Sequence, residues 1–298
     1  MTELPRLVIV GGGAGGLELA TRLGDRLGRT GRASVTLVDR ARAHVWKPLL
    51  HEIAAGSMDL GQHELDYLAQ AHWHHFSYRV GEMIGLDRAR REIHVGPVVD
   101  EDGKQVTAQR SFGYDLLVIA VGGVTNTFGT PGVGEYAVTL DTPEQAARFH
   151  RRLVNACIRA HAQSGPLLSH QLQVAIIGAG ATGVELAAEL HKSTRELVAY
   201  GLDRIDPDKD IKLTIIEAAP RILPALPERI AGATGELLRN LNIEVLASAR
   251  VAEVSAEGVH LADGRWVPAE LVVWAAALTL CRSGLSKTSP ASAVSIRG

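Results

Sequence analysis

Apolar positions follow the same order twice along the chain: a short run of branched residues, a glycine-rich turn, and a stretch in which apolar residues recur at helical spacing. The runs lie at residues 7–10 and 174–177, and Ala, Leu and Glu are frequent after each turn. Short β-branched runs predict buried strands, and helical spacing predicts an amphipathic helix. Strand, turn and helix in this order are typical of α/β domains.

The two regions are copies of one unit. Residues 8–23 and 175–190 share nine identities in sixteen aligned positions, and each contains three glycines spaced as GxGxxG. Such a turn lets backbone N–H groups and a helix N-terminus approach a pyrophosphate. One motif alone is weak evidence, whereas the duplicate predicts two Rossmann-like dinucleotide domains. The glycines are Gly11, Gly13 and Gly16 in the first copy and Gly178, Gly180 and Gly183 in the second.

Each copy also places an acidic residue at the end of its second strand. Asp39 follows Gly16 by 23 residues, and Glu217 follows Gly183 by 34. A carboxylate at this position accepts hydrogen bonds from the adenosine ribose. We attribute the longer spacing to a polar insertion at residues 201–210. The competing interpretation is that both turns are plain tight turns with solvated acids at the strand ends.

Small residues end a further apolar run in each copy. Residues 114–122 include Ala120 and Gly122 at their end, and residues 270–277 include Ala275. A turn of small residues lets the backbone lie close to a flat ligand, so these runs are expected to close each unit beside its cofactor. The region 243–261 is expected to form short antiparallel strands inserted before the second closing strand.

Composition narrows the classes of partner. With 31 Lys and Arg against 33 Asp and Glu, the net charge of −2 indicates neither nucleic acid nor an anionic membrane as partner. Cys157 and Cys281 form no CxxC, so no disulfide framework or metal site is expected. The N-terminus lacks the features of a signal peptide, and the longest apolar run is too short to span a bilayer.

Two tandem dinucleotide units resemble the flavin reductases related to glutathione reductase, and four segments resemble type II NADH dehydrogenase over residues 6–276. These segments are Val35–Arg40, Val45–Glu52, Gly180–Leu186 and Arg221–Pro227. The resemblance implies FAD in residues 1–150 and NADH in residues 151–277. Gly11, Gly13, Gly16 and Asp39 would hold FAD, with Lys47 and Pro48 near the flavin ring, and Gly178, Gly180, Gly183 and Glu217 would hold NADH.

The same resemblance implies an enzyme that passes a hydride from NADH to flavin and two electrons on to a quinone. Glu185 would face the nicotinamide as a catalytic residue, although a helix-start acid is the alternative for Glu185 and a solvated loop lysine the alternative for Lys47. No cysteine pair lies within residues 44–56, which argues against disulfide reduction. Two other functions stay open: a reductase of a ferredoxin or nitrite reductase partner, and a non-catalytic NADH-binding fragment.

The resemblance stops after Ala276. Residues 278–298 are expected to be an aberrant tail without a recognisable element, as a premature stop or shifted reading frame would produce. The FAD domain, which is discontinuous in this family, is then expected to lack its C-terminal part. The family's amphipathic anchor, which holds members at the cytoplasmic face of the membrane, is also absent, so this chain is expected to be soluble. A homodimer stays open.

Overall fold

The computed structural model describes residues 3–59, 61, 63–276 and 278–280, and the chain forms two compact units. The first is formed chiefly by residues 3–44 and 64–122, and the second by residues 45–63 and 123–279. This division differs from the contiguous ranges 1–150 and 151–277. The reason is packing, because helices from residues 50–55 and 143–162 share the core of the second unit.

The first unit contains a four-stranded parallel sheet in the order β11-β1-β2-β5 and a three-stranded antiparallel sheet in the order β10-β7-β6. Two short strand pairs, β3 with β4 and β8 with β9, complete its β structure. Its elements are β1 (Arg6–Val10), α1 (Ala14–Leu23), the π-helix η1 (Gly24–Gly28), β2 (Ser34–Asp39), β3 (Ala43–His44), β4 (Leu65–Asp66), α3 (Tyr67–Trp73), β5 (Ser77–Val80), β6 (Met83–Asp87), β7 (Glu92–Val95), β8 (Val98–Val99), β9 (Gln105–Thr107), β10 (Arg110–Gly113) and β11 (Leu116–Ile119).

The parallel sheet of the first unit is covered on both faces. Successive residues of a strand point to opposite faces, and β1 follows this rule. Ile9 packs with Leu17 of α1, whereas Val8 and Val10 pack with Ile93 of the antiparallel sheet. The unit is therefore a three-layer arrangement of helices, parallel sheet and antiparallel sheet.

The second unit repeats this plan with a five-stranded parallel sheet in the order β13-β20-β14-β15-β16 and an antiparallel sheet in the order β17-β18-β19. Its elements are the 3₁₀ helix η2 (Lys47–Leu49), α2 (Leu50–Ala55), β12 (Gly123–Thr125), α4 (Val133–Tyr136), β13 (Ala137–Thr139), α5 (Pro143–Ala162), β14 (Gln173–Ile177), α6 (Ala181–Ala199), β15 (Lys212–Ile216), α7 (Glu228–Asn240), β16 (Glu244–Leu246), β17 (Val251–Ser255), β18 (Gly258–Leu261), β19 (Trp266–Pro268), β20 (Leu271–Trp274) and β21 (Leu278–Leu280).

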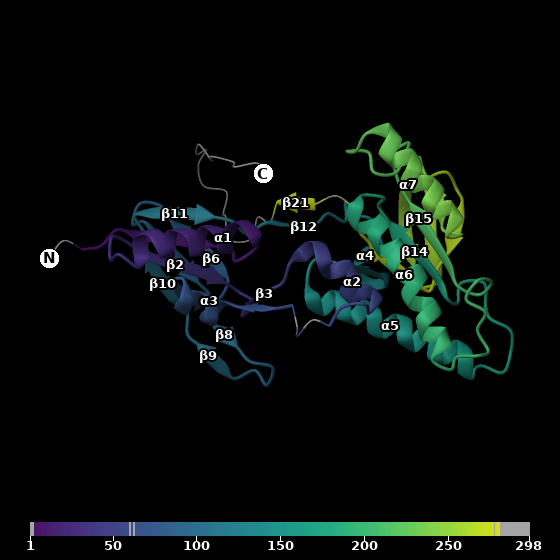
Figure 1. Cartoon of the computed structure of the whole chain (residues 1–298), viewed down its shortest axis with the longest axis horizontal. Coiled ribbons are helices and arrows are strands. Elements are labelled where there is room, and N and C mark those ends of the chain that lie inside the picture. The colour runs from purple at the N-terminus through teal and green to yellow at the C-terminus, as the bar shows by residue number, and fades with distance from the viewer. Residues whose placement is uncertain (1–2, 60, 62, 277, 281–298) are drawn as a thin grey trace. The chain divides into compact units, whose positions relative to one another are not determined.

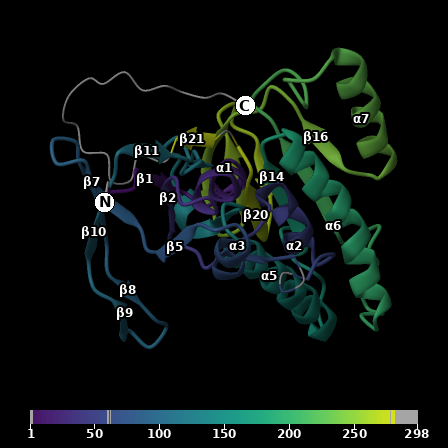
Figure 2. The same cartoon turned by 60° about the vertical axis from the view of Figure 1, so that its left-hand side comes forward.

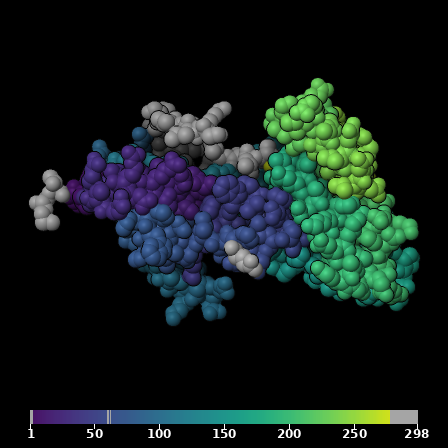
Figure 3. All heavy atoms as spheres, viewed as in Figure 1, coloured from purple at the N-terminus to yellow at the C-terminus, as the bar shows by residue number. Residues whose placement is uncertain are grey.

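Helices cover one face of the second parallel sheet. Ile176 of β14 packs in the core shared with α2, α5, α6 and α7, whereas its neighbours Ala175 and Ile177 pack against β17–β19. Helices α2, α5 and α6 lie side by side in both ribbon views (Figures 1 and 2). Helix α7, light green in the space-filling view, forms part of the outer surface of this unit (Figure 3). The α/β class and the duplication expected from the sequence are confirmed.

Two details differ from expectation. Residues 244–246 form β16, which pairs in parallel with β15, so only β17–β19 are the inserted antiparallel strands. Residues 278–280 form β21, which is paired with β12, so the expectation that the tail has no element is wrong for these three residues. The rest of that tail, residues 281–298, lies outside the described residues.

Candidate functional site

The second glycine turn needs glycine at two positions because backbone lies against it. Gly178 follows β14 with φ of +105°, and an added Cβ would lie 2.8 Å from the carbonyl oxygen of Ala275. Gly183, on the first turn of α6, packs directly on the carbonyl group of Gly178. The turn is thereby pressed against both its own helix and the end of β20, which fixes where the helix begins.

Gly180 differs because it faces open space. It is the N-cap of α6, no side chain caps the helix, and nothing lies within 4 Å of an added Cβ. The first N–H groups of a helix have no partner within the helix and carry a partial positive charge. An anionic group such as a pyrophosphate therefore fits this end of α6, and a side chain at residue 180 would fill the space that it needs.

Glu217 holds the glycine turn from the end of β15. Its carboxylate accepts a hydrogen bond from the Ala179 N–H at 2.7 Å through one oxygen and from the Ala219 N–H at 2.7 Å through the other. Each carboxylate oxygen can accept a second hydrogen bond, so both still offer a lone pair to a ribose hydroxyl. Glu217 thus shapes the turn and remains available to a ligand.

A cavity of about 900 Å³ lies over this turn. Its size is within the range of cavities that hold cofactors. Its lining includes three predicted site residues of the turn and strand ends, Gly178, Gly180 and Glu217, together with Ala275. The remaining lining residues are Thr125, Phe128, Gly129, Thr130, Pro131, Leu140, Ile177, Thr182, Ile216, Ala218, Pro224, Ala249, Arg250, Val251, Ala252, Trp274 and Ala276.

The first unit repeats this local geometry. Gly11 has φ of +103° and lies against Ala120 at the end of β11, and Gly16 packs on the carbonyl group of Gly11. Gly13 is the N-cap of α1 without a side-chain cap, and an added Cβ there would meet nothing within 4 Å. Gly122, with φ of +69°, is also open to its surroundings. This turn therefore fits an anionic group in the same way.

Asp39 is the counterpart of Glu217. It accepts hydrogen bonds from the Gly12 N–H at 2.5 Å and the Ala41 N–H at 2.7 Å. Tyr67 also holds the turn, because its hydroxyl donates a hydrogen bond to the Gly12 carbonyl at 2.6 Å. Burial, together with the negative charge of Asp39, raises the pKa of Tyr67, so the phenol stays protonated and keeps donating.

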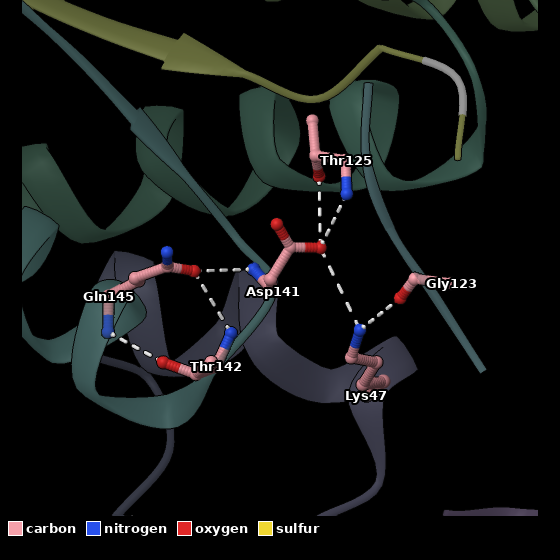
Figure 4. A network of polar contacts seen from close by, with 6 residues as sticks. All are labelled: Lys47, Gly123, Thr125, Asp141, Thr142 and Gln145. Carbon is pink, nitrogen blue, oxygen red and sulfur yellow. Dashed lines mark hydrogen bonds and ion pairs between the residues drawn. The ribbon is translucent and has the colours of Figure 1, made fainter. Parts of the chain in front are cut away.

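Lys47 takes part in a polar network within the second unit (Figure 4). Its ammonium donates to the Gly123 carbonyl at 2.9 Å and lies 3.7 Å from a carboxylate oxygen of Asp141. That same oxygen accepts from the backbone N–H of Thr125 at 2.9 Å and from its hydroxyl at 3.0 Å. Gln145 accepts from the Asp141 N–H at 2.8 Å in the capping box of α5. The network holds Thr125, a cavity residue, against the start of α5.

Four predicted residues of the second unit, Lys47, Pro48, Gly183 and Glu185, lie outside the cavity lining. Glu185 is exposed on α6, with one carboxylate oxygen 3.7 Å from Nδ1 of the buried His51 on α2. The His51 ring is held by the carbonyl of Pro48 at 2.7 Å from the same nitrogen. Pro48 therefore fixes the turn that leads into α2. The flavin and nicotinamide contacts expected of Lys47, Pro48 and Glu185 stay predictions.

An arginine-held loop borders the cavity and was not predicted. Arg221 donates to the carbonyls of Leu223 and Pro224 at 3.0 Å each and to that of Leu226 at 2.9 Å. The Leu223 N–H in turn donates to the Ala179 carbonyl at 2.8 Å, next to the glycine turn. A single arginine ahead of a proline-containing run is a sequence signal for such a loop, but spacing alone does not identify the carbonyls that it binds.

Phe128 and Arg250 are further lining residues that sequence reasoning missed. Phe128 has φ of +52°, and its N–H donates to the side chain of Asn126 at 2.8 Å. Trp274 donates from its indole to the Asn126 carbonyl at 2.9 Å. No motif marks these residues, because the loop at residues 125–132 meets β17 and β20 only in the folded chain.

Residues 5–287 match the model of the family described as pyridine nucleotide-disulphide oxidoreductase. The chain belongs to this family. Curated proteins similar to it include the type II NADH:quinone oxidoreductase of Haemophilus influenzae, which is 40% identical over 285 residues. The corresponding Staphylococcus aureus protein is 27% identical over 276 residues. The matches cover 92% and 91% of this chain, which spans only 64% of the length of either relative.

Solved structures share the fold of this family member. NDH2 from Plasmodium falciparum in complex with NADH superposes with a TM-score of 0.80 at 24% identity, covering 94% of this chain and 56% of that one. The ferredoxin reductase for the CYP199A2 system of Rhodopseudomonas palustris gives a TM-score of 0.67 at 18% identity, covering 92% and 59%. At these identities the likeness establishes the fold alone.

Two further observations concern Cys157 and the potential metal ligands among the described residues. Burial raises the pKa of the Cys157 thiol, on α5, to about 11, so this cysteine is a packing residue. Within the described residues, no group of three His, Cys, Asp or Glu side chains is arranged to hold a metal ion. No helix in the same part of the chain is long and apolar enough to cross a membrane.

Proposed function

We propose that this family member is an FAD-dependent enzyme that oxidises NADH and passes two electrons to a quinone. The observation that carries the proposal is the cavity over the second glycine turn, with Gly180 open and Glu217 at the strand end. The names of the Haemophilus influenzae and Staphylococcus aureus relatives support quinone as the acceptor. FAD, when bound, supplies the group that accepts the hydride and passes electrons on.

The protein's own residues bind and orient the two nucleotides. In the second unit, the open N-terminus of α6 would bind the pyrophosphate of NADH, and Glu217 would accept hydrogen bonds from the adenosine ribose. In the first unit, the turn around Gly13 with Asp39 would bind the corresponding parts of FAD. No protein nucleophile is needed, which fits a buried Cys157 with a raised pKa.

Glu217 favours NADH over NADPH. The 2′-phosphate of NADPH would bring negative charge against a carboxylate that is already fixed by two backbone N–H groups. We expect competitive titration of the full chain to give tighter binding of NADH. Equal affinity for NADH and NADPH would show that Glu217 does not determine the choice of nucleotide.

The test of function is NADH oxidation by the full chain supplied with FAD, with a water-soluble quinone as acceptor. The Haemophilus influenzae relative serves as positive control, and Gly180→Val as the variant that blocks the nucleotide turn. Quinone-dependent oxidation that Gly180→Val abolishes is the expected result. Oxidation of NADH with a ferredoxin but not with a quinone would show that the proposed acceptor is wrong. Binding of NADH without oxidation in the presence of either acceptor would show that the chain is a nucleotide-binding protein only.

Peripheral contact with the cytoplasmic face of the cell membrane is proposed for the full-length relatives, since quinones partition into lipid. Sedimentation of this chain in the presence and absence of lipid vesicles tests whether it makes such contact, and its mass distinguishes a monomer from a homodimer. A chain that stays in the supernatant would agree with the expectation from the sequence, and binding to vesicles would contradict it.

A further inference from the structure

Among the described residues, the lining of the cavity over the second glycine turn includes an arginine whose guanidinium has no partner. Of the described residues that line it, two carry a formal charge, Glu217 and Arg250. Glu217 is compensated by two backbone N–H groups. Arg250 is exposed, and within the described chain its guanidinium makes no hydrogen bond or ion pair. Nearby arginines are satisfied, Arg221 by loop carbonyls and Arg265 by Asp263 at 2.7 Å.

The backbone around Arg250 is fixed next to the nucleotide strand end. The N–H of the preceding residue, Ala249, donates to the Glu217 carbonyl at 2.8 Å. On the other side, the Ala262 N–H donates to the Arg250 carbonyl at 2.8 Å. Arg250 therefore lies at an anchored position immediately before β17, and its place among the lining residues is fixed by these two backbone hydrogen bonds.

An unpaired guanidinium beside a cofactor cavity is suited to an anion. Arginine binds phosphate oxygens through two parallel N–H groups, and such charge-assisted hydrogen bonds are stronger than neutral ones. Under the proposed function the ligand is NADH, whose negative charge is confined to its pyrophosphate. We propose that Arg250 binds this pyrophosphate, together with the open N-terminus of α6 behind Gly180. The inference rests on the proposed function and adds a side-chain cation to the backbone groups of the turn.

Calorimetric titration of the full chain with NADH, ADP-ribose and NADPH tests the assignment. ADP-ribose keeps the pyrophosphate and lacks the nicotinamide. Arg250→Met is expected to weaken all three ligands by a common factor of about ten, as the loss of one charge-assisted hydrogen-bonded group from a partly exposed site requires. Arg250→Lys keeps the charge and should recover part of the affinity. Higher ionic strength should weaken the wild type more than Arg250→Met.

Arg229→Met is the matched control. Arg229 is an exposed arginine near the start of α7, its guanidinium makes no hydrogen bond or ion pair with the described residues, and it lies outside the cavity lining. This variant loses the same charge and should bind all three ligands as the wild type does. Because Arg250 is exposed, the thermal unfolding midpoint should be unchanged in either variant.

Three results would overturn the assignment. Unchanged affinity of Arg250→Met for NADH, with a wild type that binds NADH, would remove Arg250 from the site and leave the proposed function intact. A loss confined to NADPH would make Arg250 a 2′-phosphate residue instead. A wild-type chain that binds none of the three ligands would overturn the proposed function, and this inference with it.

Discussion

Asp39 and Glu217 each accept two backbone hydrogen bonds, one of them from the second residue of their own glycine turn. The donors, Gly12 and Ala179, occupy equivalent positions in the two copies. An acid at this point therefore orients the turn before any ribose arrives, which lowers the conformational cost of binding. Replacing it would loosen the turn as well as removing a ribose contact.

His150 should make the second unit sensitive to acid. It lies on α5, its ring is pressed against Gly56 at the end of α2, and its buried Nδ1 has no partner within the described residues. Burial, with a smaller effect of the neighbouring Arg151, lowers the pKa of His150 below its ordinary value of 6.5. The unfolded chain then binds a proton more readily than the folded one, so stability falls as pH drops through about 6.5 and levels off below the lowered pKa.

Thermal unfolding at about pH 7.5 and about pH 5 measures this effect. His150→Gln should reduce the difference between the two unfolding midpoints. Some dependence should remain, because burial also lowers the pKa of His191 in the same unit. His63→Gln, at an exposed position, is the control and should behave as the wild type. An undiminished pH dependence in His150→Gln would show that His150 contributes nothing to it.

Spacing alone predicted which glycines and acids belong to the turns, because backbone approach permits few other residues there. It could not predict Arg250 or Phe128, whose roles depend on a cavity formed by distant segments. Nor could it give the rotamers that join Glu217 to Ala179. Glu185, chosen by resemblance, lies on the predicted helix but outside the cavity lining.

At the scale of elements, the second strand–turn–helix unit contains one glycine on which stability is expected to depend, Gly178, and one on which nucleotide binding is expected to depend, Gly180. Gly178→Ala would force an alanine into φ of +105° and place its Cβ 2.8 Å from the Ala275 carbonyl oxygen. We expect a loss of about 2 kcal/mol or more in unfolding free energy. Gly180→Val keeps an allowed conformation, φ of −70° and ψ of −177°, and its Cβ has no atom within 4 Å. It should keep the wild-type unfolding midpoint and lose NADH.

Denaturant unfolding and NADH titration of both variants check this contrast. Equal destabilisation by the two substitutions would mean that the turn is packed at both positions. Full NADH affinity in Gly180→Val would mean that no nucleotide approaches the open side of the turn. Gly201→Ala, at a second positive φ of +114° far from the turn in sequence, controls for backbone strain alone.

Strands with clear β-branched runs could be predicted because they are buried on both faces, as β1 and β14 are. The partners of short elements could not. Helix α2, with six residues, has too few turns for its pattern to define a partner, and it packs on α5 and α6. β16 is three residues long, so the sequence could not show whether it pairs in parallel or antiparallel.

At the scale of the molecule, each unit has its own cores. Ile9 and Val10 of β1 and their neighbours form those of the first unit, and Ile176 and Ile177 of β14 with their neighbours form those of the second. The internal repeat made two such units predictable. The assignment of residues 45–63 to the second unit was not predictable, because it depends on packing rather than on order along the chain.

Separate cores allow each nucleotide turn to be blocked without disturbing the other. Gly13→Val should lose FAD and keep NADH affinity, since residue 13 faces open space at the start of α1 and an added Cβ has no atom within 4 Å. Gly180→Val should do the reverse. The flavin absorbance of each purified variant and calorimetric titration with NADH give the two readouts.

Loss of FAD alone in one variant and of NADH alone in the other would assign each ligand to its unit, because a purely structural defect cannot produce this pattern. Loss of flavin in Gly180→Val with retention in Gly13→Val would exchange the ligands of the two units. Loss of both ligands in one variant, with an unfolding midpoint equal to that of the wild type, would mean that the units bind cooperatively, which separate cores do not require. The expected result, one ligand lost per variant at constant stability, follows only if each glycine turn serves a single dinucleotide.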